Sequence, residues 1–431
     1  ATTEIYTLSL HDALPISIMK SSKLFAALLG TLAVPAAVAG VYPQCPFDVN
    51  GSGVTHETDA ATQLTLHSRT VGAGTAGDPT HRQVCLHVVA GDGWQVLGDG
   101  RQSYGFGFAA AQGNDEQVMI NGIANAKFPA PTITFKEGDE VWLALTNVGM
   151  IHRPDLFDQH SVHWHGYPQA SAIFDGVPQG SATVQMGSTF TYYYKVNDPG
   201  TFMWHCHVEA TEHMEMGMLG MHGALPRQDG TAITDAVASK AFTKFAYNDG
   251  DGSTGYDKAF SLQMGAVDSN FHELHEAVQP LPFLELKGDF TQLNGRGYPM
   301  TTLENQADMP QAPDAPGLSQ QLHAVVRANA GDRVLLRLTN LSVDAYYTLT
   351  ALGLPMRIVG RGAAIARGPQ GDSWAHDTAS VTLGGGDGVD LLIDTRGVAP
   401  GTYYLYTTNL NLLSNGAGED RGGLMTTFAL Q

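Results

Sequence analysis

Two stretches of the sequence repeat one another, and this repeat limits the chain to architectures built from two similar units. DEVWLALTNV at residues 139–148 matches DRVLLRLTNL at 332–341, and GTFMWHCH at 200–207 matches GTYYLYTT at 401–408 without a gap. Such segments, rich in Thr, Val and Tyr and bounded by turn residues, are typical of β-strands. We therefore predict an all-β chain made of two copies of one β-sandwich.

The composition agrees with this prediction and excludes two classes of partner. The 431 residues include 50 glycines and 21 prolines, and 43% are hydrophobic, which favours strands and turns over a helical bundle or a disordered acidic chain. The 23 Lys and Arg residues face 42 Asp and Glu residues, which gives a formal net charge of −19. Because this excess of negative charge repels phosphates, we expect neither nucleic acid nor an anionic membrane surface as a partner.

The start of the sequence reads as a leader rather than as part of the fold. Residues 1–18 fit no element of a β-sandwich and resemble translated sequencing-adapter sequence. From Met19, two lysines precede an apolar run and a small-residue motif, which predicts a signal peptide over 19–39. We expect an exported chain, periplasmic or secreted, that starts near Gly40 and has no membrane span.

Export makes the three cysteines informative. In an oxidising compartment Cys45 and Cys85 can pair, which would tie the irregular N-terminal segment to the first sandwich. Cys206 is then left without a partner cysteine. A lone cysteine is most simply a buried and inert residue, but the neighbours of Cys206 favour a different explanation.

The order of strand-like segments predicts the domain boundaries. Residues 40–110 are rich in turns and are expected to form an N-terminal extension with opening strands. The first complete sandwich is expected over 111–245. A Gly- and Asp-rich stretch near residues 249–254 then leads into the second sandwich, which is expected over 246–431.

Residues with metal-binding side chains cluster in the first copy. They are His160, His163, His165, His205, Cys206, His207, His213 and Met218. Because successive side chains of a strand alternate between its faces, His163 and His165 share one face, and so do His205 and His207. Cys206 must point the other way, and an odd offset of three residues places His160 opposite the His163 pair. Four histidines are thus expected on one side, and a histidine with a thiol on the other.

The second of these groups has the donors of a specific metal centre. A cysteine thiolate, two imidazoles and a weak thioether are the ligands of a blue copper electron-transfer site. Zinc is the weaker choice, since methionine is a poor ligand for zinc. A single histidine could be an ordinary core or surface residue, but six at alternating spacing around a thiol point to metal binding.

The pattern HxxHxHG followed by HCHx5Hx4M resembles the multicopper oxidase family, in particular its two-domain laccase-like and copper nitrite reductase-like members. The resemblance extends to INGIANAKFPAPTI at 120–133, to DGVPQ at 175–179 and to GGGDGVDLLIDT at 384–395. It therefore spans most of residues 110–431. The fold that it implies is a tandem pair of cupredoxin-like Greek-key β-sandwiches.

The resemblance also implies which residues bind copper. The residues that match the ligands of a type 1 copper are His160, Cys206, His213 and Met218, and those that match the ligands of type 2 and type 3 coppers are His163, His165, His205 and His207. The family's laccases usually have four residues between the cysteine and the next ligand histidine, whereas six separate Cys206 from His213 here, and Thr211 stands at the usual position. We expect an insertion in this loop, with Met216 as the alternative axial ligand.

A second departure concerns the inner coppers. The family's trinuclear oxygen-reducing cluster needs two more His-x-His pairs, but the repeat aligns Tyr406, Thr407 and Thr408 with the HCH motif, and Thr350 and Leu352 with His163 and His165. The second copy is therefore expected to be a ligand-free spacer or assembly domain. The missing ligands would come from another subunit of a homo-oligomer, such as a trimer, or from His272 and His275, which are spaced for one face of a helical turn.

The family resemblance implies an oxidoreductase. A small-molecule or metal-ion donor would give single electrons to the type 1 copper near His213, and the inner centre would reduce dioxygen, as in laccases, or nitrite, as in the reductases. A blue copper electron carrier without catalytic activity is the third interpretation. Asp175 matches an acidic residue that assists proton delivery in the family, although an Asp before a glycine is also a common turn residue.

Overall fold

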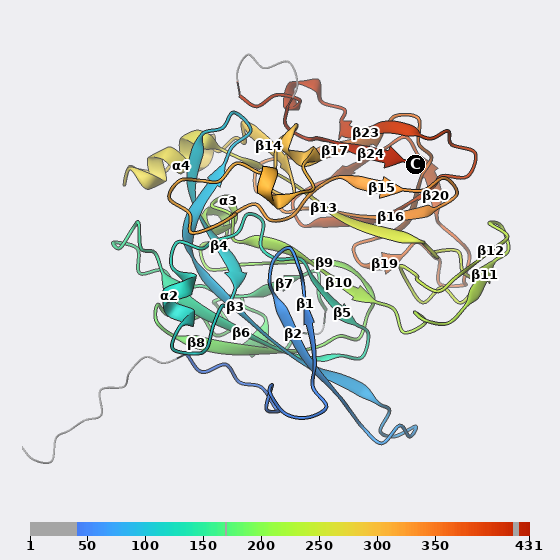
Figure 1. The fold of residues 1–431 in the computed structure, drawn as a ribbon, viewed down its shortest axis with the longest axis horizontal. Helices are drawn as coiled ribbons and strands as arrows, with labels where there is room; N and C mark the ends of the chain where they lie inside the picture. The colour runs from blue at the N-terminus through green and yellow to red at the C-terminus, as the bar shows by residue number, and fades with distance from the viewer. Residues whose placement is uncertain (1–40, 169, 417–421) are drawn as a thin grey trace, which may run out of the picture. The chain divides into compact units, whose positions relative to one another are not determined.

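The computed structural model describes residues 41–168, 170–416 and 422–431, so the expected signal peptide at 19–39 and the segment 1–18 lie outside the described residues. Strands dominate the described part, and its helices are short (Figure 1). The helices there are too short or too polar for a membrane crossing. The expected all-β class is confirmed.

The first sandwich consists of two sheets with mixed strand directions. One sheet has the order β1-β2-β3-β6-β8, with β4 paired to β3, and the other has the order β5-β10-β9-β7. The bounds are β1 Thr55–Thr58, β2 Thr65–Val71, β3 His81–Val96, β4 Gln102–Ala110, β5 Ile133–Lys136, β6 Glu140–Gly149, β7 His163–His165, β8 Thr189–Lys195, β9 Gly200–His205 and β10 Leu219–Leu225. The pairs β3/β6 and β5/β10 are parallel and join strands that are not consecutive in the chain.

The second sandwich has the same plan. Its sheets have the orders β14-β13-β16-β22-β18-β19, with β20 paired to β18, and β15-β24-β23-β17-β21. The bounds are β13 Lys258–Val267, β14 Phe290–Leu293, β15 Val326–Ala328, β16 Arg333–Asn340, β17 Tyr347–Ala351, β18 Met356–Arg361, β19 Ala364–Ile365, β20 His376–Thr378, β21 Ser380–Leu383, β22 Asp387–Asp394, β23 Gly401–Thr407 and β24 Met425–Leu430. The small hairpin of β11 (Ile233–Asp235) and β12 (Lys240–Phe242) precedes it.

Short helices connect the strands. They are α2 (Val118–Gly122), α3 (Ala210–Glu215) and α4 (Ser269–Glu276), with 3-10 turns η1 (Ala172–Phe174), η2 (Phe283–Glu285), η3 (Met300–Thr302), η4 (Gln306–Asp308) and η5 (Leu410–Leu412). The helix α3 lies in the loop that follows the HCH motif, which is where the sequence predicts an insertion. The helix α4 confirms the helical turn expected for His272 and His275.

The register of the strands confirms the internal repeat. In the first copy β7 pairs with β9, and His163 stands opposite His205. In the second copy β17 pairs with β23, and Thr350 stands opposite Tyr406. These are the partners that the sequence repeat aligns, so the second sandwich retains the backbone of the site without its imidazoles.

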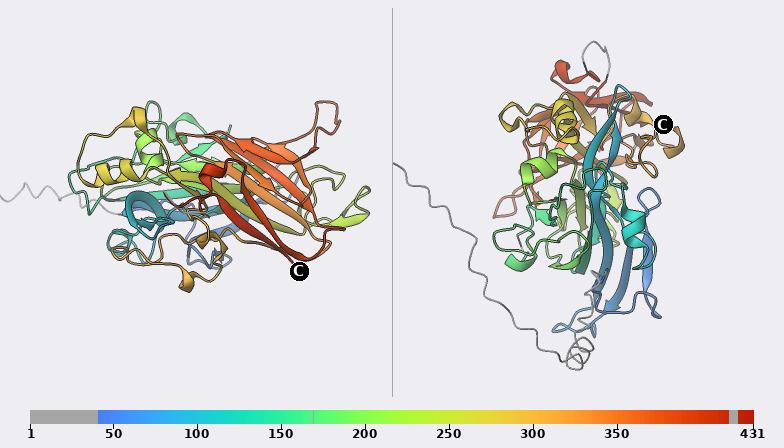
Figure 2. Two further views of the ribbon diagram at one scale, coloured as in Figure 1. Left: turned by 90° about the horizontal axis from the view of Figure 1, so that it is seen from above. Right: turned by 90° about the vertical axis from the view of Figure 1, so that its left-hand side faces the viewer.

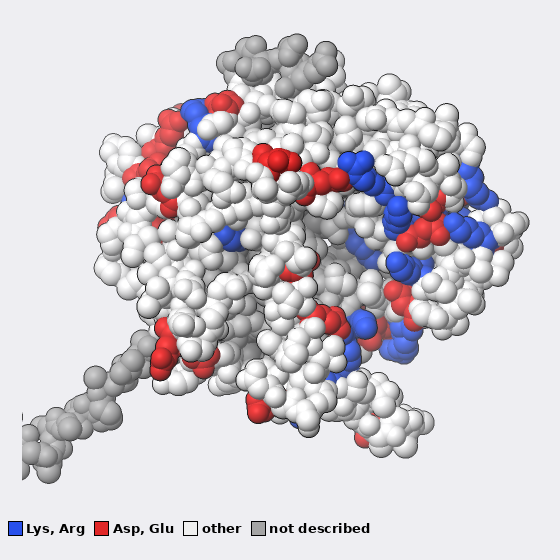
Figure 3. Space-filling view, in the orientation of Figure 1, with Lys and Arg blue, Asp and Glu red and all other residues white. Residues whose placement is uncertain are grey.

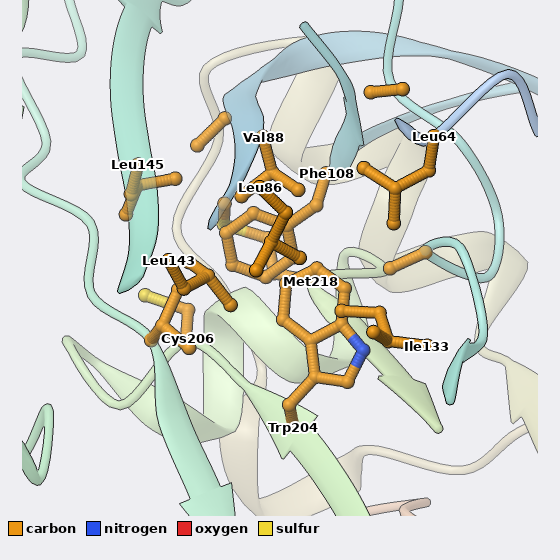
Figure 4. Close-up of a cluster of buried hydrophobic side chains, with 14 of the residues drawn as sticks. Leu64, Leu86, Val88, Phe108, Ile133, Leu143, Leu145, Trp204, Cys206 and Met218 are labelled. Atoms are coloured by element: carbon orange, nitrogen blue, oxygen red, sulfur yellow. The ribbon is translucent and has the colours of Figure 1, made fainter. Parts of the chain in front are cut away.

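Alternation along β7 and β9 places tryptophans in the core between the histidines. Trp164 and Trp204 face one another across the strand pair and are 1% and 0% exposed. Figure 4 shows Trp204, Cys206 and Met218 in one buried cluster with leucines of β3 and β6. The tryptophan face therefore fixes which way the histidines of the same strands point.

The two sandwiches contact one another through β9, β16 and β22. Figure 2 shows the blue-to-green first part of the chain packed beside the yellow-to-red second part. The Thr201 hydroxyl donates to Asp390 Oδ1 (2.6 Å), and Arg337 Nη1 donates to Thr201 Oγ1 (2.8 Å) and lies 3.3 Å from Asp390 Oδ1. All three side chains are buried. This charged pair carries hydrogen bonds, as a buried ion pair must, and it holds the second sandwich against the strand that leads to Cys206.

The cysteine pairing expected from the sequence is confirmed. Cys45 and Cys85 form a disulfide, while Cys206 is free and buried. On the face shown in Figure 3, most Lys and Arg side chains lie on the right beside Asp and Glu side chains, and the left side shows mainly Asp and Glu. This distribution agrees with the excess of acidic residues in the sequence.

Two histidines outside the metal-binding motifs, the buried His222 and the half-buried His87, link stability to pH. His222 is 2% exposed among aromatic rings, and burial lowers its pKa to about 3. Burial likewise lowers the pKa of His87 to about 4. Both pKa values lie below the value of about 6.5 in an unfolded chain. The folded state therefore favours the neutral rings, and its stability is complete above about pH 6.5 and falls as the pH drops below that value.

We expect the metal-free protein to lose on the order of a few kcal/mol of stability between about pH 6.5 and about pH 4. His222→Phe removes one titrating ring, so its melting temperature should decline less steeply over this range, apart from a constant offset from the larger ring. Thermal melting at several pH values measures this, with exposed His376→Ala as the control. Equal slopes for His222→Phe and the parent would contradict the prediction.

Candidate metal centres

The thiol of Cys206 lies in a group with two imidazoles. Cys206 directly follows β9, His213 lies in α3, and His160 forms an isolated bridge with Val184. Cys206 Sγ is 3.3 Å from His213 Nδ1, and the ring centroids of His160 and His213 are 5.1 Å apart. One donor atom from each of the three residues falls within 4.8 Å of the others, and all three are 0% exposed.

Hydrogen bonding within this group is incomplete. Both ring nitrogens of His160 and the Nε2 atom of His213 have no hydrogen-bond partner among the described residues. Buried polar atoms of this kind are rare and call for an explanation such as a bound ion. The Ser161 backbone N–H donates to Cys206 Sγ (3.4 Å), which would stabilise a thiolate.

Burial sets the protonation of the same residues. It lowers the pKa of His213 to about 4 and that of His160 well below the ordinary value, so both rings are neutral and can act as ligands at neutral pH. Burial raises the pKa of the Cys206 thiol to about 11. A cation that displaces the thiol proton would therefore compensate both the buried thiolate and the unpaired nitrogens, and the donor set fits a copper ion of the blue type.

The loop between Cys206 and Met218 is closed by backbone hydrogen bonds. Cys206 N–H donates to the Met218 carbonyl (3.1 Å), and Met218 N–H donates to the His213 carbonyl (2.9 Å). The extra residues form α3, which carries His213 to the thiol, whereas Thr211 lines the cavity of the inner histidines. Met216 and Met218 are both 0% exposed.

The other four histidines converge on the opposite side of β7 and β9. His163 is directly across from His205, with ring centroids 5.1 Å apart. The His207 ring is also 5.1 Å from that of His163, and His165 Nδ1 is 3.2 Å from His205 Nε2. Donor atoms of His163, His165 and His205 lie within 4.8 Å of one another, as three ligands of one ion would.

Backbone carbonyls orient two of these rings. His205 Nδ1–H donates to the Cys206 carbonyl (2.7 Å), and His163 Nδ1–H donates to the Asp175 carbonyl (2.6 Å). Each bond keeps the proton on Nδ1 and the lone pair on Nε2, which is the usual support of a metal-bound histidine. Burial is the main cause that lowers the pKa of His163, His165 and His205, to about 3 for His205.

Asp175 has both of the features expected from the sequence: it is an acidic residue near the inner histidines, and it is part of a turn. Its carboxylate Oδ1 is 3.5 Å from His163 Nδ1, so an acidic group stands beside the inner histidines. It also precedes a tight turn, since Gly176 has φ +77° and a Cβ there would lie 2.1 Å from the Val162 carbonyl oxygen. The turn is what brings the carboxylate to the imidazole.

A cavity of about 500 Å³ opens at the four inner histidines, and the second sandwich forms its other wall. The residues from the second sandwich are Leu341, Ser342, Val343, Asp344, Ala345, Tyr346, Gly385 and Gly386. None of these eight described lining residues is a histidine, as the sequence repeat predicts. The expectation of a mere spacer is nevertheless too narrow, because this domain encloses the site.

His272 and His275 lie elsewhere. Both nitrogens of His272 face backbone carbonyl oxygens, those of Tyr104 and Glu215. His275 Nε2 is bonded to Glu212 Oε1 (2.8 Å), and Arg153 donates to its Nδ1 atom (3.2 Å). Neither lines the cavity of the inner histidines, so both rings support α3 and β4 instead of completing the inner group.

A family model matches part of the chain. The multicopper oxidase family model matches residues 109–228, which include all eight candidate ligands. Residues 109–228 are a multicopper oxidase domain. The family binds copper, so the metal that fits the donor set of Cys206 is also the metal of the family.

Relatives and solved structures extend the match. Laccase-1 of Cryptococcus neoformans var. grubii is 25% identical over 323 residues, which cover 73% of this chain and 45% of the relative. Multicopper oxidase VdtB of Byssochlamys spectabilis is 33% identical over 135 residues, covering 30% of this chain and 18% of that protein. The chain thus spans less than half the length of these curated relatives.

The fold is similar to that of a blue copper oxidase from Nitrosomonas europaea. The TM-score is 0.58 at 22% identity, over 80% of this chain and 85% of that one. A copper nitrite reductase from the same organism gives a TM-score of 0.52 at 16% identity, over 81% and 94%. These likenesses confirm the tandem cupredoxin-like fold expected from the sequence.

One contact of the multicopper oxidase domain with the second sandwich could not be found from the ligand motifs. Gly386, in the loop before β22, has φ +88°, and a Cβ there would lie 2.5 Å from His165 Nε2. The GGGDG run at 384–388 was the available signal, since a glycine often marks a close approach of the backbone. Gly386 therefore sets how closely the second sandwich covers His165.

We expect Gly386→Ala to push His165 from its position and to lower both the copper content of the inner group and turnover, while the blue colour stays. Gly371→Ala is a matched control, because Gly371 has the same φ of +88° but no atom within 4 Å of an added Cβ. Both variants bear the strain of a left-handed alanine, about 1–2 kcal/mol, and only Gly386→Ala meets the ring. Metal analysis distinguishes them, and equal copper contents would refute the role of Gly386.

Proposed function

We propose that this chain is an exported, copper-dependent oxidoreductase of the laccase-like type, which takes single electrons from a donor at one centre and reduces dioxygen at the other. The observation that carries this proposal is the tripeptide at 205–207. Its central thiol belongs to one donor group and both flanking imidazoles face the other, so a few covalent bonds connect the two groups.

Each group has its own residues and task. The residues that would hold the type 1 copper are His160, Cys206, His213 and Met218, and those that would hold the inner copper are His163, His165, His205 and His207. Bound copper would supply reversible one-electron chemistry at both places. Met218 is preferred to Met216 as the axial ligand because its backbone closes the loop onto both Cys206 and His213.

Electron entry would lie at the His213 edge. His213 Nε2, which points away from the thiol, is 3.9 Å from Asp158 Oδ2, and the Asp158 side chain is 22% exposed. A small-molecule or metal-ion donor that reaches this carboxylate is separated from the ligand ring by one short contact. This route is supported by His213 Nε2, which faces the partly exposed Asp158 carboxylate.

Dioxygen reduction consumes protons as well as electrons. The Asp175 carboxylate is the acidic group beside His163, at 3.5 Å from Nδ1, and is partly exposed to solvent. Its position between solvent and His163 makes it the candidate for assisting proton delivery to the cavity. The backbone bond from His163 Nδ1–H keeps this ring in one tautomer meanwhile.

A copper nitrite reductase-like activity is the second candidate. It is favoured by the inner donor group of three, His163, His165 and His205, which suits a single ion better than a cluster of three. A trinuclear copper cluster would need further ligands from a second copy of the chain. The proposal of a dioxygen-reducing, laccase-like enzyme therefore includes a homo-oligomer. The Cys45–Cys85 disulfide agrees with export to the periplasm or beyond in either case.

Two assays distinguish these activities. Oxygen uptake with a phenolic donor is expected for the laccase-like enzyme, and turnover of nitrite with a reduced electron donor is expected for the alternative. A protein that is blue and reducible but inactive in both assays would contradict both and would be an electron carrier.

A further inference from the structure

A pair of histidines outside both centres has the geometry of a metal site. His56 in β1 stands directly opposite His67 in β2, on the hairpin at the edge of the first sheet (Figure 1). Their Nδ1 atoms are 2.8 Å apart, and the two rings meet edge to face with centroids 5.0 Å apart. Two lone-pair nitrogens at this distance must share either a proton or a cation.

We propose that His56 and His67 form a separate surface site for a divalent copper ion. Neither residue belongs to the motifs that carry the two centres, and neither lines the cavity of the inner histidines. The site is therefore independent of the proposed activity.

The distance between the nitrogens selects the metal geometry. With metal–nitrogen bonds of about 2.05 Å, two ligands at right angles have nitrogens about 2.9 Å apart, whereas tetrahedral ligands have them about 3.3 Å apart. The observed 2.8 Å fits the right-angled case. Square-planar and tetragonal sites with nitrogen and oxygen ligands are typical of Cu²⁺ and Ni²⁺ and not of Zn²⁺.

The surroundings hold the pair in place and leave room for water. On its other side β2 pairs with β3, where His67 stands opposite Cys85 of the disulfide, so its backbone is fixed on both sides. His56 is exposed, so water can supply the remaining ligands of the ion. The neighbouring cross-strand pair, Thr58 and Thr65, is bonded hydroxyl to hydroxyl at 2.8 Å.

The nearby charges permit a cation. Arg69 follows His67 on the same face, but its Nε donates to Gln83 Oε1 (3.0 Å) and its Nη2 to the Pro46 carbonyl (3.1 Å), which directs the guanidinium away from the pair. Glu57 lies next to His56 in sequence, and its carboxylate is engaged by Arg82 (3.0 Å). The chain as a whole has a net charge of −19, which attracts cations.

The test uses protein without an affinity tag that is loaded with copper and then briefly treated with EDTA, which removes copper from the exposed pair while the two buried centres stay occupied. Ni²⁺ is the probe for the emptied pair. Calorimetric titration should show one Ni²⁺ per chain, and His56→Ala and His67→Ala should each weaken this binding at least tenfold while the blue colour is unchanged. His376→Ala, which removes an exposed histidine of the second sandwich, should bind like the parent. Binding that is absent in the parent, or equal in all four proteins, would overturn the proposal.

Electron paramagnetic resonance of the parent protein tests the site without any substitution, and so does not depend on whether the variants fold. In the parent protein, one further equivalent of Cu²⁺ should give an electron paramagnetic resonance signal with coupling to two histidine nitrogens, distinct from the blue centre. Coupling to one nitrogen or none would show that the pair keeps its proton and does not bind the ion. Loss of oxygen uptake is not expected in either surface variant, so this site can fail without affecting the proposed function.

Discussion

Replacing Cys206 by serine is expected to abolish the blue colour of the copper-loaded protein and to lower turnover at least about a hundredfold. The colour comes from the bond between copper and thiolate, and a serine hydroxyl cannot replace the thiolate. Loss of a mere supporting partner of a metal ligand already costs about 10- to 100-fold in affinity or activity. Visible absorption, copper analysis and oxygen uptake measure the effect.

The same variant should keep its fold. Serine is similar in size, and the Ser161 backbone N–H that faces the sulfur can donate to the new hydroxyl, so the cost to the metal-free protein should be no more than about 1–3 kcal/mol. Met216→Leu is the control, since it changes a buried sulfur of the same loop outside the proposed ligand set and should leave the protein blue. A blue Cys206→Ser protein would show that Cys206 is not a copper ligand.

His163→Ala is expected to do the reverse, leaving the colour and removing turnover. His163 belongs to the inner donor group and is not among the donors grouped with the thiol, which are His160, Cys206 and His213, so the first centre should fill and remain reducible. Without it, three of the four inner histidines remain, and oxygen uptake should fall at least about a hundredfold. Stopped-flow reduction followed by oxygen uptake separates the two centres.

Thr211→Ala is the matched control for His163→Ala. Thr211 lines the same cavity but belongs to neither group of donor atoms in the described structure, so its loss should leave copper content and turnover nearly unchanged. Full oxygen uptake by the His163→Ala protein would mean that reduction of the acceptor does not depend on the inner histidines.

Local patterns were sufficient to predict how the histidines sort between the two faces. The period of a strand is two, so the spacing in HWH and HCH determines which side chains share a face, and the pairing of His163 with His205 agrees with it. The repeat likewise predicted that Thr350 and Tyr406 take the corresponding positions. These features depend only on sequence neighbours and on an internal match.

The loop after Cys206 shows where spacing is insufficient. The usual spacing puts Thr211 at the position of the ligand histidine, and only an insertion puts His213 there. The helix α3 that carries His213 has no strong sequence signal. The short length of α3 is the physical reason, since isolated helices of this size are held by tertiary contacts and not by propensity.

Contacts between distant segments could not be predicted either. His272 and His275 do share a helix, as their spacing indicates, but their partners come from β4, α3 and Arg153. The wall that Ser342 and Gly386 add to the inner cavity depends on how the sandwiches pack. The pairing of His56 with His67 depends on the register of the β1–β2 hairpin. A slip of one residue would place the two rings on opposite faces of the sheet.

The most direct test of the account is the number of copper atoms per chain in the reconstituted protein, measured on the His67→Ala variant so that the surface pair does not contribute. We predict a value clearly above one together with the full blue colour, because the thiol group and the inner histidines each hold metal. A value of one with full blue colour would contradict the account, since the inner histidines would then lack copper and the chain would be an electron carrier.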